Sequence, residues 1–528
     1  MELTPTLEQI RIIEEPSNCV VIAGPGSGKT YTLACKIKKV LPSLPDHKGV
    51  VAISYTNRAS DELQRRCLST GLNSKGSFFG TIDRFFISEI IIPFGKRTFG
   101  SPSQVIEVVK AEELETQESF QGDALDDVEV LGNLFRSGKI VLERIGLLAV
   151  HILDSCQSCQ RYIKARYTHV IIDEYQDCGE SQHELFMRLV QLGLIGVAVG
   201  DADQSIFGFA GRSPAHLFAL AQNADLFKTY NLSQNHRCHL SIINYSTRLL
   251  SSGYKPEKTD EVCVYSKLID GSEIEVAQWL TSSIPQIKVQ FQIERLSTVA
   301  ILFKNRLTGN LVHRYLGLPH KSIAATPLDD DSSSWGLVFR RVLTWVFSPG
   351  LTKHELLEGF LHVDFQPRAF REALNILSQI EALAAADHNK LAIHFQLFEK
   401  LALVLFPDRR NREAAKGLQQ VLNTSILLES FIPPRDDEVQ LMTLHKSKGL
   451  EFDIVFHLNL YRWILPQFRG DYYQDLNLHY VGITRAKKCC VLCSSTYRHR
   501  TETEVIPADE SEFLYINDLH ELRWPCPV

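Results

Sequence analysis

The sequence lacks the features that mark a membrane or secreted protein. No apolar run approaches the ~18 residues of a membrane-spanning helix, and Glu2 and Glu8 stand where a secretory signal would be basic and then apolar. No internal repeat and no low-complexity tract occurs. We therefore expect a globular cytoplasmic protein with no membrane partner.

Composition gives no strong sign of one ligand class either. The formal net charge is only −6, so a nucleic-acid ligand would need local positive grooves instead of a generally basic surface. Hydrophobic residues make up 44% of the chain, which is ordinary for a protein with buried cores. At this length we expect about two to four domains.

Cysteine is also too scarce for a disulfide scaffold, with twelve among 528 residues, which indicates a reducing compartment. Two pairs, Cys156/Cys159 and Cys490/Cys493, have the CxxC spacing and together would suit a Cys₄ zinc or iron–sulfur site. The second pair lies in "KCCVLCSS", which is typical of a buried strand, and the first lies in a helical stretch without glycine. We predict that both pairs pack as thiols in cores, with metal binding as the alternative.

Apolar runs recur along the chain and alternate with helical or loop segments. Near-continuous apolar strands between helices favour parallel sheets that are covered on both faces. Residues 86–165 and 321–435 interrupt this rhythm with helical patterns, and strands resume after each. The sequence thus predicts an α/β fold with two helical insertions. The runs are "NCVVIA", "VVAISYT", "HVIIDE", "IGVAVGD", "STVAILFK", "VQLMTLH", "DIVFHLNL" and "KCCVLCSS".

The stretch "VIAGPGSGKTYTL", residues 21–33, fits a phosphate-binding loop between a strand and a helix. Its glycines let backbone N–H groups curl around phosphates, and the N-terminus of the following helix favours the same negative charge. Lys29 would reach the β- and γ-phosphates, and the Thr30 hydroxyl would bind Mg²⁺. The expected nucleotide-binding residues are Ala23, which replaces the usual glycine, Gly24, Pro25, Gly26, Ser27, Gly28, Lys29, Thr30 and Tyr31.

Two further segments supply the groups that phosphoryl transfer needs. In "HVIIDEYQD", residues 169–177, we expect Asp173 to bind Mg²⁺ and Glu174 to act as the general base toward the attacking water. In "VGDADQSIFGF", residues 199–209, Gln204 would sense the γ-phosphate together with the neighbouring aspartates. Phe207 and Phe209 are candidate stacking platforms for bases, with a core position as the alternative.

Together with these three segments, the remaining motifs resemble those of the superfamily 1A helicases of the UvrD, Rep and PcrA type over most of the chain. The motifs are "LTPTLEQ", "ISYTNRASDELQRR", "FFGTIDRFF", "LSQNHR", "VQLMTLHKSKGLEFDIV" and "LHYVGITRAKK". The resemblance implies that Gln9 contacts the adenine and Glu451 the ribose. It implies that Lys29, Glu174, Gln204 and two transition-state arginines, Arg237 and Arg485, are catalytic. The implied contacts to single-stranded DNA are Tyr55, Thr56, Asn57, Thr81, Phe207, Phe209 and His445.

The resemblance also implies an architecture and an activity. Two RecA-like parallel-sheet domains would hold ATP and Mg²⁺ between them, and hydrolysis would drive 3′-to-5′ movement on single-stranded DNA or a tailed duplex. The expected parts are domain 1A at residues 1–85 and 166–230, insertion 1B at 86–165, domain 2A at 231–320 and 436–528, and a reduced insertion 2B at 321–435.

At a finer level, the short build and "GTID" followed by "FFISEIIIPFG" resemble the helicase subunit of Gabija-type antiphage systems. That likeness implies a nuclease partner of the OLD family with a Toprim domain. A DNA-repair helicase is the competing role, and a DNA-binding subunit whose nucleotide state switches a nuclease is a third interpretation. Asp83 departs from the family, since a DNA-contacting histidine is usual at its position.

Overall fold

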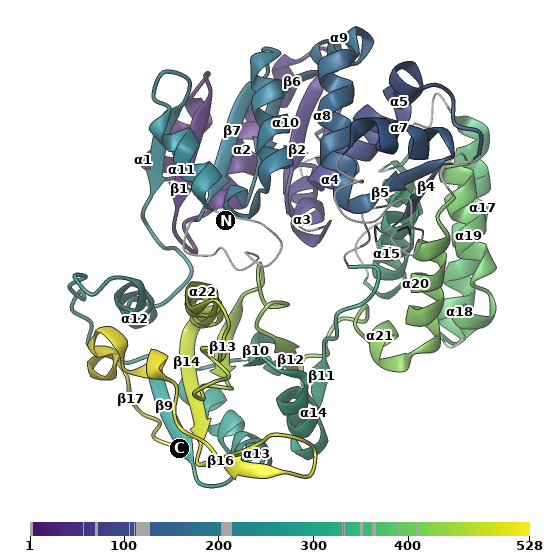
Figure 1. The fold of residues 1–528 in the computed structure, drawn as a ribbon. Coiled ribbons are helices and arrows are strands. Elements are labelled where there is room, and N and C mark those ends of the chain that lie inside the picture. Colours follow the sequence, from purple (N-terminus) through teal and green to yellow (C-terminus); the bar gives the residue numbers. More distant parts are fainter. Residues whose placement is uncertain are drawn as a thin grey trace.

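Two parallel β-sheets, each covered by helices, form the two ends of the molecule in the computed structural model (Figure 1). The structure describes residues 4–528 except 56, 69–71, 105, 110, 112–113, 115–126, 202–213, 330, 332, 349–351, 359, 362–365, 389 and 408–409. Within this part of the chain, no helix combines the length and the apolar character needed to cross a membrane.

Among the described residues, the first sheet has six parallel strands in the order β3-β2-β6-β7-β1-β8. Alternate residues of its central strands face two different cores: Val51 and Ile53 pack on one face, and Val50 and Ala52 pack on the other. The strands are β1 (Cys19–Ala23), β2 (Gly49–Ile53), β3 (Phe78–Gly80), β6 (Tyr167–Ile172), β7 (Ile195–Gly200) and β8 (Lys228–Leu232). The helices associated with it are α1 (Leu7–Glu14), α2 (Lys29–Val40), α3 (Asn57–Leu68), α10 (Glu180–Gln191) and α11 (Ala215–Gln222).

The second sheet, in the part of the chain that the structure describes, has seven parallel strands in the order β11-β12-β10-β13-β14-β9-β17. It too is buried on both faces, because Ala300 and Leu302 pack into one core while Val299 and Ile301 pack into the other. The strands are β9 (Val264–Ile269), β10 (Val299–Phe303), β11 (His320–Ser322), β12 (Val439–Thr443), β13 (Phe452–His457), β14 (Ala486–Ser495) and β17 (Trp524–Pro525). Its helices are α12 (Leu240–Leu250), α13 (Glu273–Gln290), α14 (Arg306–Tyr315) and α22 (Tyr472–Ile483). The predicted α/β class with two parallel sheets is confirmed.

A helical segment lies between β3 and β6 in the sequence, and another lies between β11 and β12. The first shares one continuous core with the first sheet, since Phe135 and Ile53 belong to the same cluster of buried side chains. The second has a core of its own around Trp335 and Phe339. The predicted domain bounds stay predictions. The first segment comprises α4 (Ile82–Phe85), the π-helix Phe86–Ile91, α5 (Ile92–Phe99), β4 (Glu107–Val109), α7 (Val128–Arg136), β5 (Lys139–Val141), α8 (Ile145–Ser155) and α9 (Gln157–Arg166). The second comprises α15 (Ser334–Phe347), α16 (Lys353–Glu358), α17 (Pro367–Ala386), α18 (Lys390–Ile393), α19 (Gln396–Leu405), α20 (Arg412–Asn423) and α21 (Ser425–Glu429).

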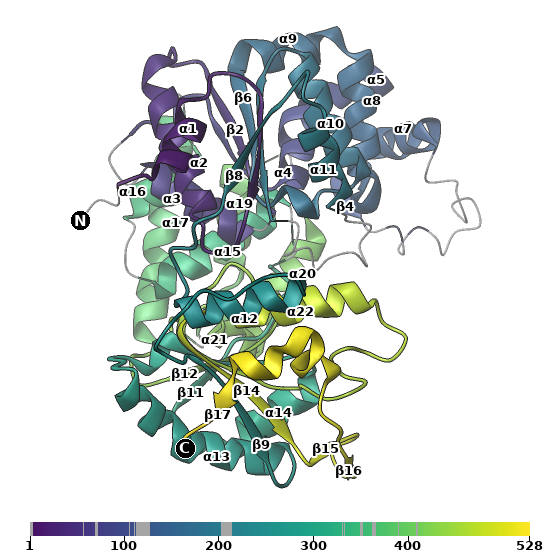
Figure 2. The ribbon, with the colours of Figure 1, turned by 90° about the vertical axis from the view of Figure 1, so that its left-hand side faces the viewer.

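In both ribbon views the second helical segment reaches alongside the first sheet's end of the molecule, with α15 toward α3 (Figure 2). The contact is an ion pair: Arg340 and Arg341 of α15 bind Asp61 of α3. This segment therefore follows the second sheet in the chain but is tied to the first.

The cysteine pairs lie in cores, and all twelve cysteines are free thiols. On β14, Cys490 faces one core and Cys493 faces the core on the opposite side of the sheet, so the two thiols cannot share a metal ion. Within the described part of the chain, the one group of three side chains placed to hold a metal is His239, Glu261 and Cys263, which includes neither pair.

Candidate nucleotide site between the two sheets

The loop after β1 has the backbone of a phosphate cradle. Gly26 has φ 68° and Gly28, the residue that precedes α2, has φ 81°, so both lie in the left-handed region that favours glycine. A Cβ at Gly26 would stand 2.4 Å from the side-chain oxygen of Asn235, and one at Gly28 would stand 2.6 Å from Gln9 Nε2. The left-handed conformation favours glycine at both positions, and at Gly26 the close approach of Asn235 and of the Arg237 Cβ adds to this requirement.

Hard oxygen ligands meet at the start of α2. Thr30 Oγ1 donates to Asp173 Oδ2 at 2.9 Å, and Lys29 Nζ lies 3.6 Å from Asp201 Oδ2. Asp173 follows β6 and Asp201 follows β7, so both carboxylates stand at the carboxyl ends of parallel strands, where open α/β sheets bind ligands. A hydroxyl and a carboxylate at hydrogen-bonding distance suit Mg²⁺, and the donor set fits this ion.

The two neighbouring acids, Asp173 and Glu174, differ in their proton affinity. Burial, and then the charge of Glu174, raise the pKa of Asp173. Burial would also raise the pKa of Glu174, but Lys29 and then Lys448 outweigh it, so that the pKa of Glu174 is lowered. Glu174 also has φ 57°, a left-handed backbone that costs a non-glycine residue free energy and is typical of functional sites. Glu174 is thus held ionised, as a base must be.

Gln176 connects the two strand ends and carries no role in the sequence interpretation. Its Nε2 donates to Glu174 Oε2 at 2.6 Å, and its Oε1 accepts from the backbone N–H of Asp201 at 2.9 Å. The side chain is fully buried. The signal was present in the motif "DEYQD", but an amide gives no hint of its partners before the fold is known.

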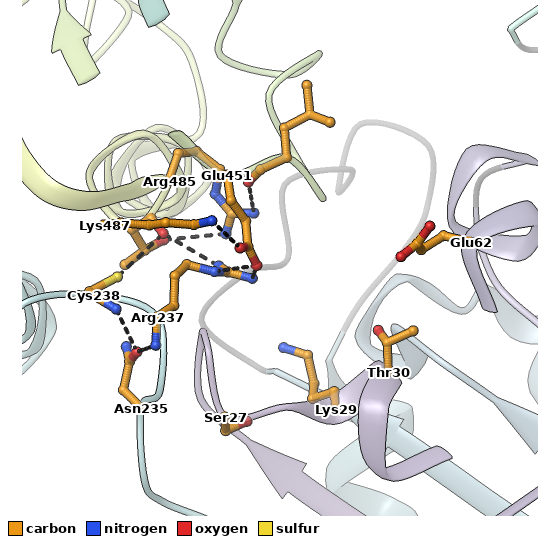
Figure 3. A network of polar contacts seen from close by, with 12 residues as sticks. Ser27, Lys29, Thr30, Glu62, Asn235, Arg237, Cys238, Glu451, Arg485 and Lys487 are labelled. Carbon is orange, nitrogen blue, oxygen red and sulfur yellow. Dashed lines mark hydrogen bonds and ion pairs between the residues drawn. The ribbon is translucent and has the colours of Figure 1, made fainter. Parts of the chain in front are cut away.

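The opposite wall carries the two predicted arginines and Glu451 (Figure 3). Arg237 Nε and Nη2 each lie 2.7 Å from Glu451 Oε1, and Lys487 Nζ lies 3.2 Å from Glu451 Oε2. The backbone beside Arg237 touches the phosphate loop, since the N–H of His236 donates to the carbonyl of Gly26 at 2.9 Å. The backbone of Arg237 therefore lies beside the phosphate loop, while its guanidinium binds the carboxylate of Glu451, directly before β13.

Arg485 is 1% exposed and is held within the second half of the molecule. Its Nε donates to the carbonyl of Val481 at 3.0 Å and its Nη1 to that of Leu450 at 3.3 Å. Burial, and then the charge of Arg237, lower its pKa to about 10. Figure 3 shows both arginines on one side of the site, with Lys29 on the other. The structure brings Arg237, Arg485 and Glu451 together, facing the phosphate loop.

The predicted base-contacting residue, Gln9, supports the loop itself. Its Nε2 donates to the carbonyl of Ser27 at 3.1 Å, and its Oε1 accepts from the N–H of Thr6 at 3.0 Å. An amide keeps a second hydrogen and a second lone pair, so a contact with adenine stays a prediction.

The predicted DNA contacts are distributed along the first sheet and beyond it. Tyr55 donates to Gln182 Oε1 at 2.5 Å, and buried Thr81 caps α4 by accepting from the N–H of Arg84. His445, after β12, is exposed. Four predicted residues, and the side chain of a fifth, Asn57, lie outside the described residues. The four are Thr56, Gln204, Phe207 and Phe209.

Two family models match this chain. The model described as an AAA domain matches residues 7–210, which contain the phosphate loop, and the UvrD-like helicase C-terminal domain matches residues 369–497. Similar proteins match along most of their length. Gabija protein GajB of Bacillus cereus is 28% identical, covering 94% of this chain and 97% of that protein. The ATP-dependent DNA helicase Rep of Escherichia coli is 22% identical, covering 99% and 95% respectively. The ATP-dependent DNA helicase PcrA of Staphylococcus epidermidis is 21% identical, covering 93% and 83%.

Proposed function

Since the chain belongs to the superfamily 1A DNA helicases of the UvrD, Rep and PcrA type and is related to GajB, we propose that it moves 3′ to 5′ along single-stranded DNA by hydrolysing ATP between its two sheets. The observation that supports this proposal most is the two-sided site. Lys29, Thr30 and Asp173 stand on one wall, and Arg237 and Arg485 stand on the other.

Each wall has a distinct chemical task in this proposal. Lys29 binds the β- and γ-phosphates, and Thr30 and Asp173 hold Mg²⁺, which supplies charge neutralisation when bound. Glu174 takes the proton of the attacking water, because its lowered pKa keeps it ionised. Arg237 and Arg485 offset the negative charge that develops on the transferred group, a contribution of about 10³–10⁵ in rate for an arginine finger.

The coupling to DNA follows from the position of the arginines. Arg237 exchanges Glu451 for the phosphates in each cycle, and this exchange requires the two walls to approach. A strand that contacts both halves, through Tyr55 and Thr81 on one and His445 on the other, is gripped differently in the two arrangements. Hydrolysis then moves the protein along the strand in one direction.

For the biological role, we propose antiphage defence together with a nuclease of the OLD and Toprim type. This role is supported by the similarity to GajB, which extends over 94% of the chain. A role in DNA repair is the alternative, and the two differ in their partner. Co-expression with the candidate nuclease, followed by size-exclusion chromatography, distinguishes them: a stable complex supports defence, and two separate peaks contradict it.

The motor activity is tested by steady-state ATPase with and without single-stranded DNA over a salt series. We expect strong stimulation that falls as salt rises, since the strand is held through its phosphates. Unwinding of duplexes with a 3′ tail and a 5′ tail then tests direction, and preference for the 5′ tail contradicts the proposal.

A second candidate, a nucleotide-switched DNA-binding subunit with little unwinding, is favoured by one feature. Both arginines already have partners in the second half of the molecule, Glu451 for Arg237 and backbone carbonyls for Arg485. ATPase that DNA leaves unchanged, together with DNA binding that depends on nucleotide, would identify this switch.

A further inference from the structure

Two adjacent arginines of α15 converge on one carboxylate of α3. Arg340 Nη1 lies 3.0 Å from Asp61 Oδ2, and Arg341 Nη2 lies 2.8 Å from Asp61 Oδ1. Arg341 adds a second bond to the same oxygen through Nε at 3.2 Å. Asp61 is thus held by two guanidiniums from a helical segment that is remote in the sequence.

The cluster contains more positive charge than Asp61 can balance. Arg84, which follows Thr81, lies within the electrostatic reach of both α15 arginines. The three guanidiniums line one cavity together with Asp61. Three positive charges against one carboxylate leave this part of the cavity suited to a further anion.

The neighbouring acids do not remove this imbalance. Glu62 binds Arg65 and Arg66, and Glu89 accepts from Tyr162 and Tyr167. Asp329 acts on Arg340 electrostatically, but its carboxylate binds Lys446. Burial raises the pKa of Asp331, which favours its neutral form. These carboxylates therefore bind other partners or are favoured in the neutral form, and they do not neutralise the three arginines.

Arg340 supplies an independent observation that points to an anion at this place. Its side chain is 9% exposed, so it is more than nine-tenths buried. Its Nε and Nη2 nevertheless have no hydrogen-bond partner among the residues that the structure describes. Buried donors of a charged group are costly to leave without acceptors, and a guanidinium offers phosphate two parallel donors.

The position of the cluster indicates which anion reaches it. Asp61 lies on α3, whose first residue, Asn57, is itself a predicted DNA contact, and Arg84 lies three residues after Thr81. The same cavity continues to Lys29 and His445. A strand laid along the predicted contacts therefore passes this cluster.

We propose that Arg84, Arg340 and Arg341 bind a backbone phosphate of the DNA strand, and that Asp61 occupies the phosphate position when the strand is absent. This inference rests on the proposed DNA-binding function. It adds a site that joins the first sheet to the second helical segment. In exchanging carboxylate for phosphate, the arginines keep the helical segment in contact with the strand.

The test measures affinity for an oligothymidine strand by fluorescence anisotropy as a function of salt. We expect Arg340→Gln with Arg341→Gln to weaken binding about tenfold at low salt and to reduce the slope of log K against log salt by ~0.7, the value for one phosphate on a single strand. Asp61→Asn removes the competing anion and should tighten binding several-fold. Arg368→Gln with Arg371→Gln, two exposed positions on α17, is the matched control and should change neither quantity.

A purely structural ion pair gives the opposite pattern. Asp61→Asn would then lower the melting temperature and leave DNA affinity unchanged or weaker. All variants would show the same salt slope, and that result overturns the inference. Arg341→Lys provides a second variant in case the double variant misfolds. Because it keeps the positive charge, it should retain most of the slope of log K against log salt. Failure of the motor proposal looks different: DNA would not stimulate ATPase in the unaltered protein, while the slope difference between variants would remain.

Discussion

Lys448 Nζ lies 2.5 Å from Asp177 Oδ2, and this ion pair joins the two halves of the molecule beside the nucleotide site. Asp177 follows β6 of the first sheet and is fully buried, whereas Lys448 follows β12 of the second sheet. The same ammonium helps to lower the pKa of Glu174. A change in the distance between the two halves therefore alters the electrostatic environment of the proposed general base.

Replacing Lys448 by methionine should uncouple ATP hydrolysis from DNA. The substitution leaves Asp177 as a buried charge without this partner, a loss of about 3–5 kcal/mol for buried pairs. We expect a lower melting temperature and a loss of most DNA stimulation of ATPase. Lys446→Met is the control, because Lys446 lies on the same turn as Lys448 but binds the partly exposed Asp329. Equal DNA stimulation in the two variants would contradict a coupling role for Lys448.

Gln176→Met should slow catalysis more than it weakens nucleotide binding. The methionine fills a similar volume but makes neither the bond to Glu174 nor the bond to the N–H of Asp201. We expect kcat to fall about 10- to 100-fold with KM for ATP changed less than threefold, since loss of a group that orients a catalytic base acts on the transition state. If KM rises while kcat stays constant, Gln176 only shapes the binding site.

Arg237→Gln should abolish most turnover and spare nucleotide affinity. The fall in kcat should be at least about 10²-fold, and Arg237→Lys should not restore it, because an ammonium cannot replace a planar two-donor group. Arg435→Gln provides the control, since Arg435 forms an exposed ion pair with Asp437. Titration with a fluorescent nucleotide separates the two effects: a large loss of affinity with normal kcat would assign Arg237 to binding alone.

The sequence was sufficient to predict those strands that can be recognised from a short run of neighbouring residues. The eight apolar runs became central strands of the two sheets, because a strand buried on both faces must be apolar along its whole length. Strands β3, β8, β9, β11 and β17 of the two sheets were not predicted. β8 is polar and largely exposed along Lys228–Leu232, and β17 spans only two residues, so neither carries the pattern of a central strand.

The contacts across the molecule were beyond prediction for a different reason. Lys448 and Asp177 are 271 residues apart, and Arg340 and Asp61 are 279 residues apart. Each side chain looks like an ordinary surface charge in the sequence, and only the packing of the two halves gives it a partner. Thr30 and Asp173 are also 143 residues apart, but each belongs to a short motif that follows an apolar strand, and these motifs could be recognised in the sequence.

A buried histidine pair should make the second sheet sensitive to acid. His457 Nε2 lies 3.1 Å from His479 Nδ1, and the pair joins β13 to α22, the helix that precedes Arg485. Burial lowers the pKa of His457 to about 4 and, with the charge of His457, holds the pKa of His479 well below its usual range. Both rings are therefore neutral in the folded protein at neutral pH.

The sign of the effect follows from proton binding in the two states. The unfolded chain takes up protons near pH 6.5 and the folded protein does not, so the free energy of unfolding should fall as pH drops below 6.5. The part of this fall that is due to His457 should level off below about pH 4. Each histidine should contribute a loss of roughly 1 kcal/mol at pH 5.5. His479→Gln keeps an amide donor toward His457 but cannot be protonated. In urea unfolding from pH 7 to 5, this variant should lose about half of the free energy of unfolding that the two histidines cost the unaltered protein. His394→Gln, on the second helical segment away from this pair, is the control. A variant whose stability falls as steeply with acid as that of the unaltered protein would show that the pair is not the source.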